Sequence, residues 1–415
     1  MRLGSRPARA VSSLLRSPRI LPSLALATVA SSGVVLAACE MISGLSRTTQ
    51  VDGDGATTPI TEAGPEDGGL GLACTPRLPE VPVSQVGSDL GRLSFAVHFV
   101  GEGTTTTPKD AGLVEGDRTR LCPRADIDLD GLETCAKLPD GGRVGPSCLS
   151  LTSTPACDTA GGGDNVGGNM VRLLLGDTPS SRNDPNAGFR DGTAGILIEL
   201  SGYNGLDDDG DVRVAAIFAI GVDDGTGKPG GTPKWDGTDT WIPERNSFVN
   251  DDLPTYVADS AFVSGGLLVA RFRKTPIPLG GTTRVSAEEI IFTARVVRDG
   301  SPPLPRRLDY GRIAARVAID SAFAYLGGRL SNGVPFCEPP NRQPITLAVC
   351  GIADLSKTPG MVDPTKPCDA FSYASGFYAE IAQRSARRSD QTIDASLPSH
   401  CPADASWPPS CSEAL

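Results

Sequence analysis

Ten cysteines besides Cys39 constrain this 415-residue chain more than any other feature, because they fall into two groups with odd numbers. Five lie in the first half and five near the end: Cys74, Cys122, Cys135, Cys148, Cys157, Cys337, Cys350, Cys368, Cys401 and Cys411. An even total in an oxidising compartment predicts five disulfides. Since each group holds five, complete pairing requires at least one bridge between the groups, across the cysteine-free residues 158–336.

The connectivity does not follow from the sequence, but close spacing favours local pairs such as Cys401 with Cys411. Cys74 or Cys337 would then make the long link. Zinc binding is the alternative use of clustered cysteines. The chain has no Cys-x-x-Cys pair and only two histidines, so disulfides are the favoured interpretation.

The N-terminus has three zones in the order of a bacterial lipoprotein signal peptide. Five Arg precede any acidic residue, an apolar run covers residues 20–38, and it ends in Leu36-Ala37-Ala38-Cys39. Pro22 and Ser23 interrupt the run, which argues against a spanning helix of about 20 apolar residues. The ending resembles a lipobox, in which small residues fit the signal peptidase and the Cys thiol receives diacylglycerol. An ordinary signal peptide with a chance cysteine is the alternative.

A covalent lipid on Cys39 would anchor the chain to a membrane. Glu40 follows it, not the Asp that tends to retain lipoproteins at the inner membrane, which favours the outer membrane, facing the periplasm or the cell surface. Cleavage before Cys39 removes five Arg and no acid, so the net charge changes from −11 to −16. A polyanionic surface repels phosphate backbones, and no nucleic-acid partner is expected.

The remainder of the chain has the pattern of a mainly β fold. Residues 39–75 are rich in Gly, Asp, Thr and Pro, the composition of a flexible tether. Leu93 to Phe99 alternates apolar and smaller residues, which predicts a half-buried strand. Further strands are predicted at residues 170–175, 194–200, 212–220, 256–263, 267–272, 290–297 and 313–317. Strands separated by turn residues favour an antiparallel β-sandwich, jelly-roll or lectin-like, over residues 76–330.

Helical spacing occurs only late in the sequence. Apolar residues recur at this spacing over 319–326 before Gly327 and over 345–352 after Pro344. A third short helix is predicted over 369–378. Residues 331–415 are therefore predicted to form a small, disulfide-stapled, partly helical lobe.

A first acidic cluster, Asp126-Ile127-Asp128-Leu129-Asp130-Gly131, is a candidate calcium loop. Alternate carboxylates before a glycine are typical of loops that wrap oxygen ligands around a hard cation. An EF-hand loop that starts at Asp126 would need a carboxylate at its twelfth position, where Lys137 stands, and Glu133 could substitute. The acidic spacing also resembles thrombospondin type 3 repeats. A solvated Asp-Gly turn is the alternative.

A second cluster, residues 204–211, holds Asp207, Asp209 and Asp211 between two predicted strands. Carboxylates this close repel one another, and millimolar extracellular calcium would relieve the repulsion. An exposed acidic hairpin turn is the alternative, because Asn-Gly and Asp-Gly pairs suit such turns.

Two of the three tryptophans, Trp235 and Trp241, flank an Asp-Gly turn that also holds Asp236 and Asp239. Exposed indole faces beside carboxylates could stack on a sugar ring, because an aromatic face matches the apolar side of a pyranose. Packing within a core or hairpin is the commoner role.

Catalytic motifs are absent from the sequence. There is no His-Glu-x-x-His and no Gly-x-Ser-x-Gly. The loop at residues 225–228 has Pro229 where a P-loop needs Ser or Thr. Glu288 and Glu289 are neighbours on a predicted strand and would point to opposite faces. We therefore expect no catalytic residues, with a carboxylate-dependent glycoside hydrolase as the less favoured alternative.

Several segments together resemble a family of uncharacterised lipoproteins of the myxobacterial type, over about residues 90–380: Asp126–Cys135, Cys157-Asp158 with Gly163-Asp164-Asn165, Gly202–Gly205, Lys234–Asp239 and Pro367–Ala370. The resemblance implies an envelope or surface location and no established activity. The chain departs from the family pattern at Thr134-Cys135, where it has one cysteine instead of two.

These observations predict a lipid-anchored envelope or cell-surface protein that acts as a binding or adhesion module and could use Ca²⁺. Its ligand would be a glycan or another protein. A structural envelope protein that binds another protein is the second hypothesis.

Overall fold

The computed structural model describes residues 70–102, 119–151, 156–168, 186–250, 252–278, 284–300, 303–331 and 333–391, with residues 400, 401, 407 and 411. The predicted signal peptide, Cys39, most of the predicted tether and the strand predicted at 170–175 lie outside these residues. Within them, no helix has the length and apolar character needed to cross a membrane.

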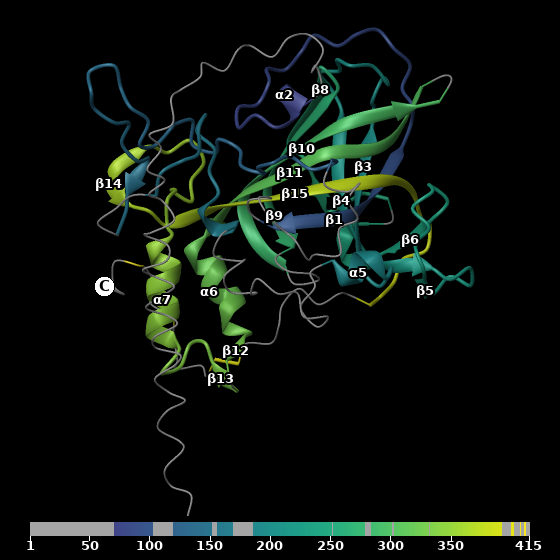
Figure 1. Cartoon of the computed structure of the whole chain (residues 1–415). Helices are drawn as coiled ribbons and strands as arrows, with labels where there is room; N and C mark the ends of the chain where they lie inside the picture. The colour runs from purple at the N-terminus through teal and green to yellow at the C-terminus, as the bar shows by residue number, and fades with distance from the viewer. Residues whose placement is uncertain are drawn as a thin grey trace, which may run out of the picture. The chain divides into compact units, whose positions relative to one another are not determined.

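One sheet of eleven strands forms most of the fold (Figure 1). Its main path runs in the order β1 (Leu93–Glu102), β3 (Gly195–Ser201), β4 (Arg213–Asp223), β6 (Thr240–Pro243), β15 (Ala370–Arg384), β11 (Leu304–Ala318), β10 (Arg284–Asp299), β9 (Leu267–Pro278) and β8 (Ser260–Ser264). Two short strands, β5 (Pro229–Gly231) and β7 (Tyr256–Val257), pair with β4.

The sheet closes on itself because β1 pairs with both β3 and β15. The closed part is a small barrel of β1, β3, β4, β6 and β15, and the other four strands continue outward from β15. Neighbouring strands within the barrel are antiparallel, except that β6 and β15 are parallel. The mainly β prediction is therefore confirmed, but these strands form one curled sheet where an antiparallel sandwich of two sheets was expected.

The physical reason is the length and position of β15. This strand of 15 residues pairs with β11 along one side and with β1 along the other. Such a shared strand keeps both sets of neighbours in one sheet. Alternation in the sequence indicates which face a side chain occupies, but it does not indicate which strand lies next to which.

The helix predicted over residues 369–378 is wrong, because this segment is the start of β15. Phe371, Tyr373, Phe377 and Tyr378 are buried within it, and aromatic side chains fit the crowded surface of a sheet. Both faces are covered, so the segment lacks the simple alternation of a half-exposed strand. β15 belongs by sequence to the predicted C-terminal lobe, yet it lies at the centre of the main sheet.

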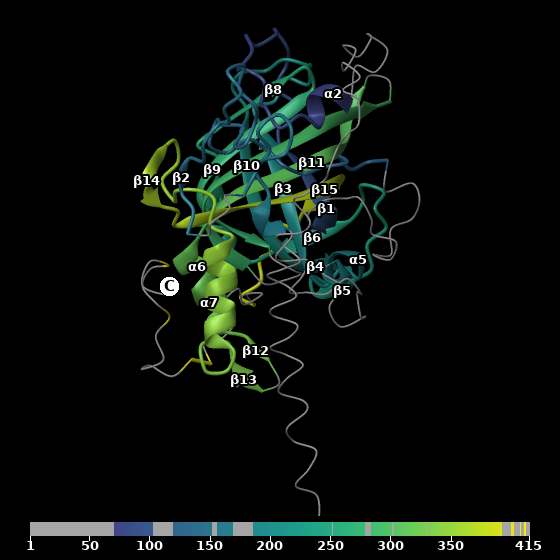
Figure 2. The same cartoon turned by 60° about the vertical axis from the view of Figure 1, so that its left-hand side comes forward.

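The other predicted elements are largely present. The strands expected at 194–200, 212–220, 267–272, 290–297 and 313–317 are confirmed as parts of β3, β4, β9, β10 and β11, and the segment 256–263 is divided between β7 and β8. The strand from Leu93 is buried on both faces, not one, because Ser94 and Ala96 are also covered. The late helices are confirmed as α6 (Ile319–Gly327) and α7 (Arg342–Gly351), which lie side by side below the sheet (Figures 1 and 2).

The remaining described elements are short. They are α2 (Leu70–Ala73), β2 (Cys148–Leu149), α5 (Ala187–Arg190), the 3-10 helix η1 (Arg245–Ser247), β12 (Leu330–Ser331), β13 (Val334–Pro335) and β14 (Asp363–Pro367).

All ten cysteines besides Cys39 form disulfides, and the parity argument is confirmed. The bridge that joins the two groups is Cys148–Cys368, held by the parallel pairing of β2 with β14. The expected local pair is wrong, since Cys401 bonds Cys337 and Cys411 bonds Cys350. The other bridges are Cys74–Cys122 and Cys135–Cys157. Five disulfides indicate an oxidising, extracytoplasmic location.

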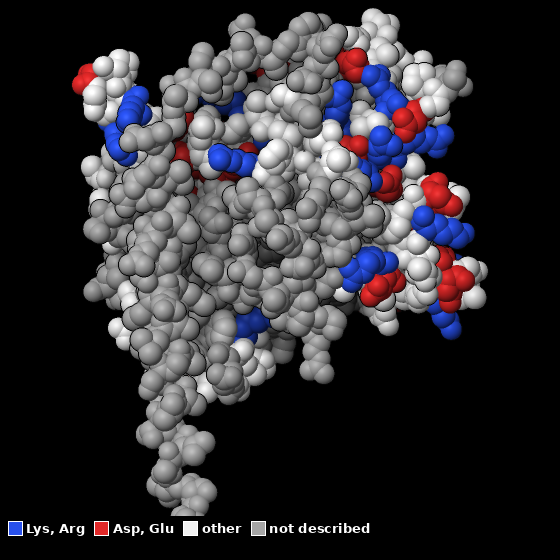
Figure 3. All heavy atoms as spheres, viewed as in Figure 1, with Lys and Arg blue, Asp and Glu red and all other residues white. Residues whose placement is uncertain are grey.

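Among the described residues visible in Figure 3, positively and negatively charged side chains are interspersed. Part of the charge is internal: Arg312 and Arg316 of β11 are among the largest fully buried side chains. Buried guanidinium groups require hydrogen-bond partners. Among those of Arg312 and Arg316 are the carbonyls of Asp126 and Leu129, in the loop described next.

Candidate metal centre

The loop of residues 126–131 owes its conformation to alternating apolar and acidic side chains. Ile127 and Leu129 are buried and pack with Leu355 in a core cluster. Successive side chains of an extended backbone point to opposite sides, so the side chains of Asp128 and Asp130 lie on the other side of the loop. Both of these carboxylates are half-buried.

A third carboxylate reaches the same place from a distant turn. The N–H of Asp164 donates to the carbonyl of Ile127 at 3.1 Å, which pairs the two segments as an isolated bridge. Carboxylate oxygens of Asp128, Asp130 and Asp164 lie within 4.8 Å of one another. In the part of the chain that the structure describes, this is the one group of acidic, His or Cys side chains that could hold a metal ion.

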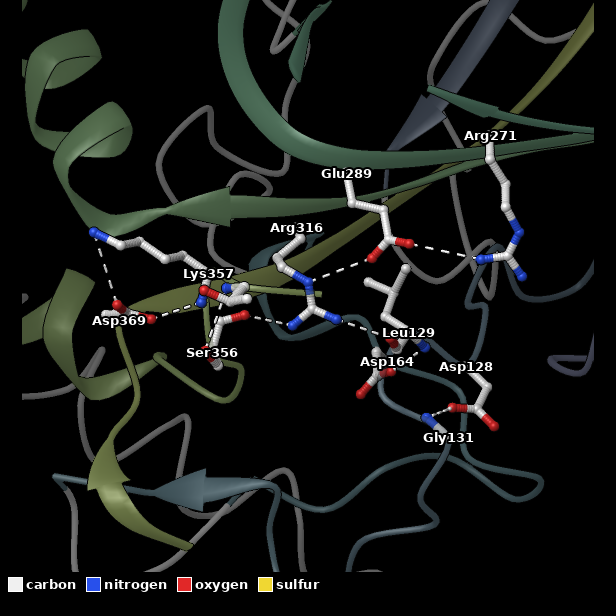
Figure 4. A network of polar contacts seen from close by, with 11 residues as sticks. Asp128, Leu129, Gly131, Asp164, Arg271, Glu289, Arg316, Ser356, Lys357 and Asp369 are labelled. Atoms are coloured by element: carbon white, nitrogen blue, oxygen red, sulfur yellow. Dashed lines mark hydrogen bonds and ion pairs between the residues drawn. The ribbon is translucent and has the colours of Figure 1, made fainter. Parts of the chain in front are cut away.

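Backbone N–H groups hold the three carboxylates. Asp164 Oδ2 accepts from Leu129 at 2.6 Å, Asp128 Oδ1 from Gly131 at 2.6 Å, and Asp130 Oδ1 from Leu132 at 2.9 Å. A carboxylate offers about four lone-pair positions. Each side chain is therefore fixed in direction and still has oxygen lone pairs for a cation. Figure 4 shows Asp128 and Asp164 close to Leu129 and Gly131 of this loop.

Two adjacent glycines allow the turn that precedes Asp164 to pack closely on residues 126–132. A Cβ atom on Gly162 would lie 2.4 Å from the carbonyl oxygen of Leu132, and one on Gly163 would lie 2.4 Å from Asp126 Oδ2. Neither position has room for a side chain. The Cys135–Cys157 disulfide ties the two segments together beside the site.

The raised pKa values of the carboxylates in and around this site indicate that it favours a bound cation or a proton. Burial raises the pKa of Asp164 to about 10, and the charges of Asp354, Asp130 and Asp158 add to the shift. Burial also raises the pKa of Asp158 to about 6 and that of Asp354 to about 7. The pKa of Asp128 is raised for the same reason. Protons balance the crowded carboxylates when no cation does so, and a divalent cation would displace them.

The structure divides the four residues chosen from the first acidic cluster. Asp128 and Asp130 belong to the group, whereas Asp126 accepts a hydrogen bond from the hydroxyl of Thr159. Glu133 accepts from the N–H of Gly161 at 3.0 Å. Both of these side chains support the neighbouring turn.

Sequence reasoning missed Asp164, and with it the nearby Asp158 and Asp354. A signal was present, because a run of three glycines immediately precedes Asp164 and a cysteine lies just before Asp158. Glycines before an acidic residue fit a backbone that packs closely on another segment. Only the pairing of Cys135 with Cys157 shows which segment that is, and the pairing could not be read from the sequence.

The second acidic cluster is not brought together in the same way. Asp207 forms an ion pair with Arg298, and the buried Asp209 accepts a hydrogen bond from the N–H of Asn204 at 2.8 Å. Asp211 is exposed. These three carboxylates therefore have separate surroundings and are not part of the metal-ligand group found among the described residues.

The side chains of residues 235–241, proposed from the sequence as a sugar-binding turn, are engaged in contacts within the protein. Trp241 is fully buried, and Trp235 stacks on His98 with ring centroids 3.9 Å apart. The carboxylate of Asp239 is buried and accepts from the N–H of Trp235 at 2.7 Å, while the exposed Asp236 accepts from the threonine two residues ahead. The indole of Trp241 consequently offers no face to a sugar.

No protein-family model, curated protein or solved structure matches this chain.

Proposed function

We propose that this chain is a calcium-binding protein of the bacterial cell envelope, anchored by a lipid on Cys39, whose role is to bind a ligand and not to catalyse a reaction. The observation behind the proposal is the convergence of Asp128, Asp130 and Asp164 within 4.8 Å. Two of these residues lie close together in sequence, and the third comes from a separate turn whose glycines permit the approach.

The donor atoms favour a hard cation such as calcium over zinc. All of them are carboxylate oxygens, the ligands of Ca²⁺, whereas Zn²⁺ in proteins is usually bound through nitrogen and sulfur. The ten cysteines outside Cys39 are oxidised, so none offers a thiolate. Calcium at millimolar concentration is available outside the cytoplasm, where the disulfides place the chain.

The spacing of the carboxylates distinguishes a cation site from a hydrolytic pair. Glycoside hydrolases hold their two carboxyl groups about 5 to 9.5 Å apart, so that a sugar or a water fits between them. Here three carboxylates, not two, have oxygens within 4.8 Å of one another. One ion fits this separation better than a glycosidic bond.

The ligand that the surface favours is another protein. Val81, Val83 and Val86 lie on one extended segment and are 63%, 92% and 102% exposed. Neighbouring exposed apolar side chains favour a protein–protein contact. The alternative glycan ligand loses support because Trp241 is buried.

A thermal-unfolding comparison tests the calcium proposal. The protein in millimolar calcium should unfold at a higher temperature than in chelator, because a ligand that binds only the folded state stabilises it. Asp128→Asn should remove most of this difference. Asp211→Asn, in the other acidic cluster, is the matched control and should keep it. Equal unfolding temperatures of the unmodified protein in calcium and in chelator would show that the proposal is wrong.

A further inference from the structure

A buried arginine lies directly behind the acidic loop. Arg316 of β11 is 1% exposed, and its guanidinium reaches two separate segments (Figure 4). Nη2 donates to the carbonyl of Leu129 at 2.8 Å, and Nη1 donates to the carbonyl of Ser356 at 2.5 Å. Both acceptors are backbone atoms, so this side chain controls the path of the chain at two points.

The first point of contact lies between two of the candidate ligands. Leu129 separates Asp128 from Asp130, and its own N–H donates to Asp164 at 2.6 Å. One backbone group of Leu129 is therefore held by the third carboxylate and the other by Arg316. The two peptide planes on either side of Leu129 set the directions in which Asp128 and Asp130 leave the backbone.

The second point of contact lies beside a further acid. Ser356 follows Asp354 by two residues, and Asp354 accepts hydrogen bonds from the N–H and hydroxyl of Ser372 at 2.8 and 2.6 Å. Asp354 is close enough to raise the pKa of Asp164 by repulsion. Arg316 thus joins the two segments that carry these acids and ties both to β11.

The charge of Arg316 is balanced on the side away from the loop. Glu289 lies 3.5 Å from Nε of Arg316 and is also paired with Arg271 at 3.6 Å. Without Glu289, a buried positive charge would stand behind the loop and repel a bound cation. The arrangement supplies hydrogen-bond donors to the loop while the neighbouring carboxylate offsets their charge.

We infer that Arg316 is a positioning residue for the cation site, holding Leu129 so that Asp128 and Asp130 converge with Asp164. The inference rests on the proposed calcium function. Residues that orient metal ligands without touching the metal typically contribute 10- to 100-fold to its affinity. Arg316 does so through a backbone carbonyl, and a lysine could not reach Leu129 and Ser356 with the same two-pronged geometry.

Calorimetric titration of the purified protein with calcium chloride tests this inference. Arg316→Lys should weaken calcium binding by about 10- to 100-fold. Arg271→Lys is the matched control, because it makes the same substitution in the other arginine paired with Glu289, which is half-exposed and has no contact with the loop among its described interactions. Its calcium affinity should equal that of the unmodified protein. Unfolding temperatures in chelator, measured alongside, separate a loss of affinity in a folded protein from a general loss of stability.

Glu289→Gln is the second variant, in case Arg316→Lys does not fold. It leaves the arginine in place but removes its balancing charge, so calcium binding should again weaken. Unchanged calcium affinity in a folded Arg316→Lys protein, or in Glu289→Gln if the lysine variant is unfolded, would overturn the role of Arg316. A failure of the unmodified protein to bind calcium would instead overturn the proposed function.

Discussion

Replacing Asp164 by asparagine should make the metal-free protein more stable, although it removes a hydrogen-bonding group from a buried site. Asparagine has nearly the same shape, and its Oδ1 can still accept the N–H of Leu129 that Asp164 accepts at 2.6 Å. What the variant avoids is the uptake of a proton on folding, which Asp164 requires because burial and neighbouring acids disfavour its charged form. Most substitutions of a buried aspartate would be expected to destabilise.

The magnitude follows from the pKa of Asp164, which burial raises from 3.8 to about 10. Between these values the folded protein holds a proton that the unfolded chain releases, so stability falls as the pH rises through this window. At pH 7 the cost is limited to about 4 kcal/mol, since each pH unit above 3.8 contributes about 1.4 kcal/mol. The asparagine side chain never ionises, so the variant should avoid up to about 4 kcal/mol of this cost.

Unfolding in chelator and in calcium, at pH 4 and pH 7, provides the assay. In chelator at pH 7 the asparagine variant should unfold at a higher temperature than the unmodified protein, and at pH 4 this advantage should disappear. Calcium at about 100 times its Kd stabilises a binding protein by about 2.7 kcal/mol, and the variant should lack this response. A variant that is less stable than the unmodified protein in chelator at pH 7 would refute the reasoning.

Three other predictions concern the neighbourhood of the site. Calcium affinity should rise between pH 5 and pH 8, because the ion must displace the proton of Asp164, whose pKa is about 10, and because the nearby Asp158 and Asp354, with pKa values of about 6 and 7, become negatively charged in this range; a pH-independent Kd in titration calorimetry would contradict this. Non-reducing peptide mapping should recover Cys148–Cys368, and its removal should lower the free energy of unfolding by about 2 to 5 kcal/mol. Gly162→Ala should weaken calcium binding because its Cβ would lie 2.4 Å from a carbonyl oxygen, whereas Gly141→Ala, with the same positive φ and open space around it, should affect only stability; equal calcium affinities would show that the close approach is unimportant.

The sequence predicted the elements whose signals are local. Alternation and turn residues located β3, β4 and β9 to β11, and the spacing of apolar residues located α6 and α7. The parity of the cysteines even required a bridge between the ends of the folded chain, which Cys148–Cys368 provides. These features depend on residues near one another in sequence or on counting alone.

Features that depend on contacts between segments far apart in the sequence could not be predicted from it. The segment from residue 370 has aromatic residues on both faces, so it lacks the alternation of an exposed strand, and only its pairing with β1 and β11 explains its conformation. The same holds for the site. Asp128 and Asp130 could be chosen from their spacing, but Asp164 joins them through a backbone bridge and a disulfide that no local pattern indicates.

A crystal structure of the protein grown in millimolar calcium, with anomalous diffraction data, would test the calcium site most directly. We predict an anomalous peak between Asp128, Asp130 and Asp164, with their oxygens at about 2.3 to 2.6 Å from the ion, the usual distance for calcium. The absence of a peak among these three carboxylates, with their side chains bonded only to protein or water, would contradict the proposal.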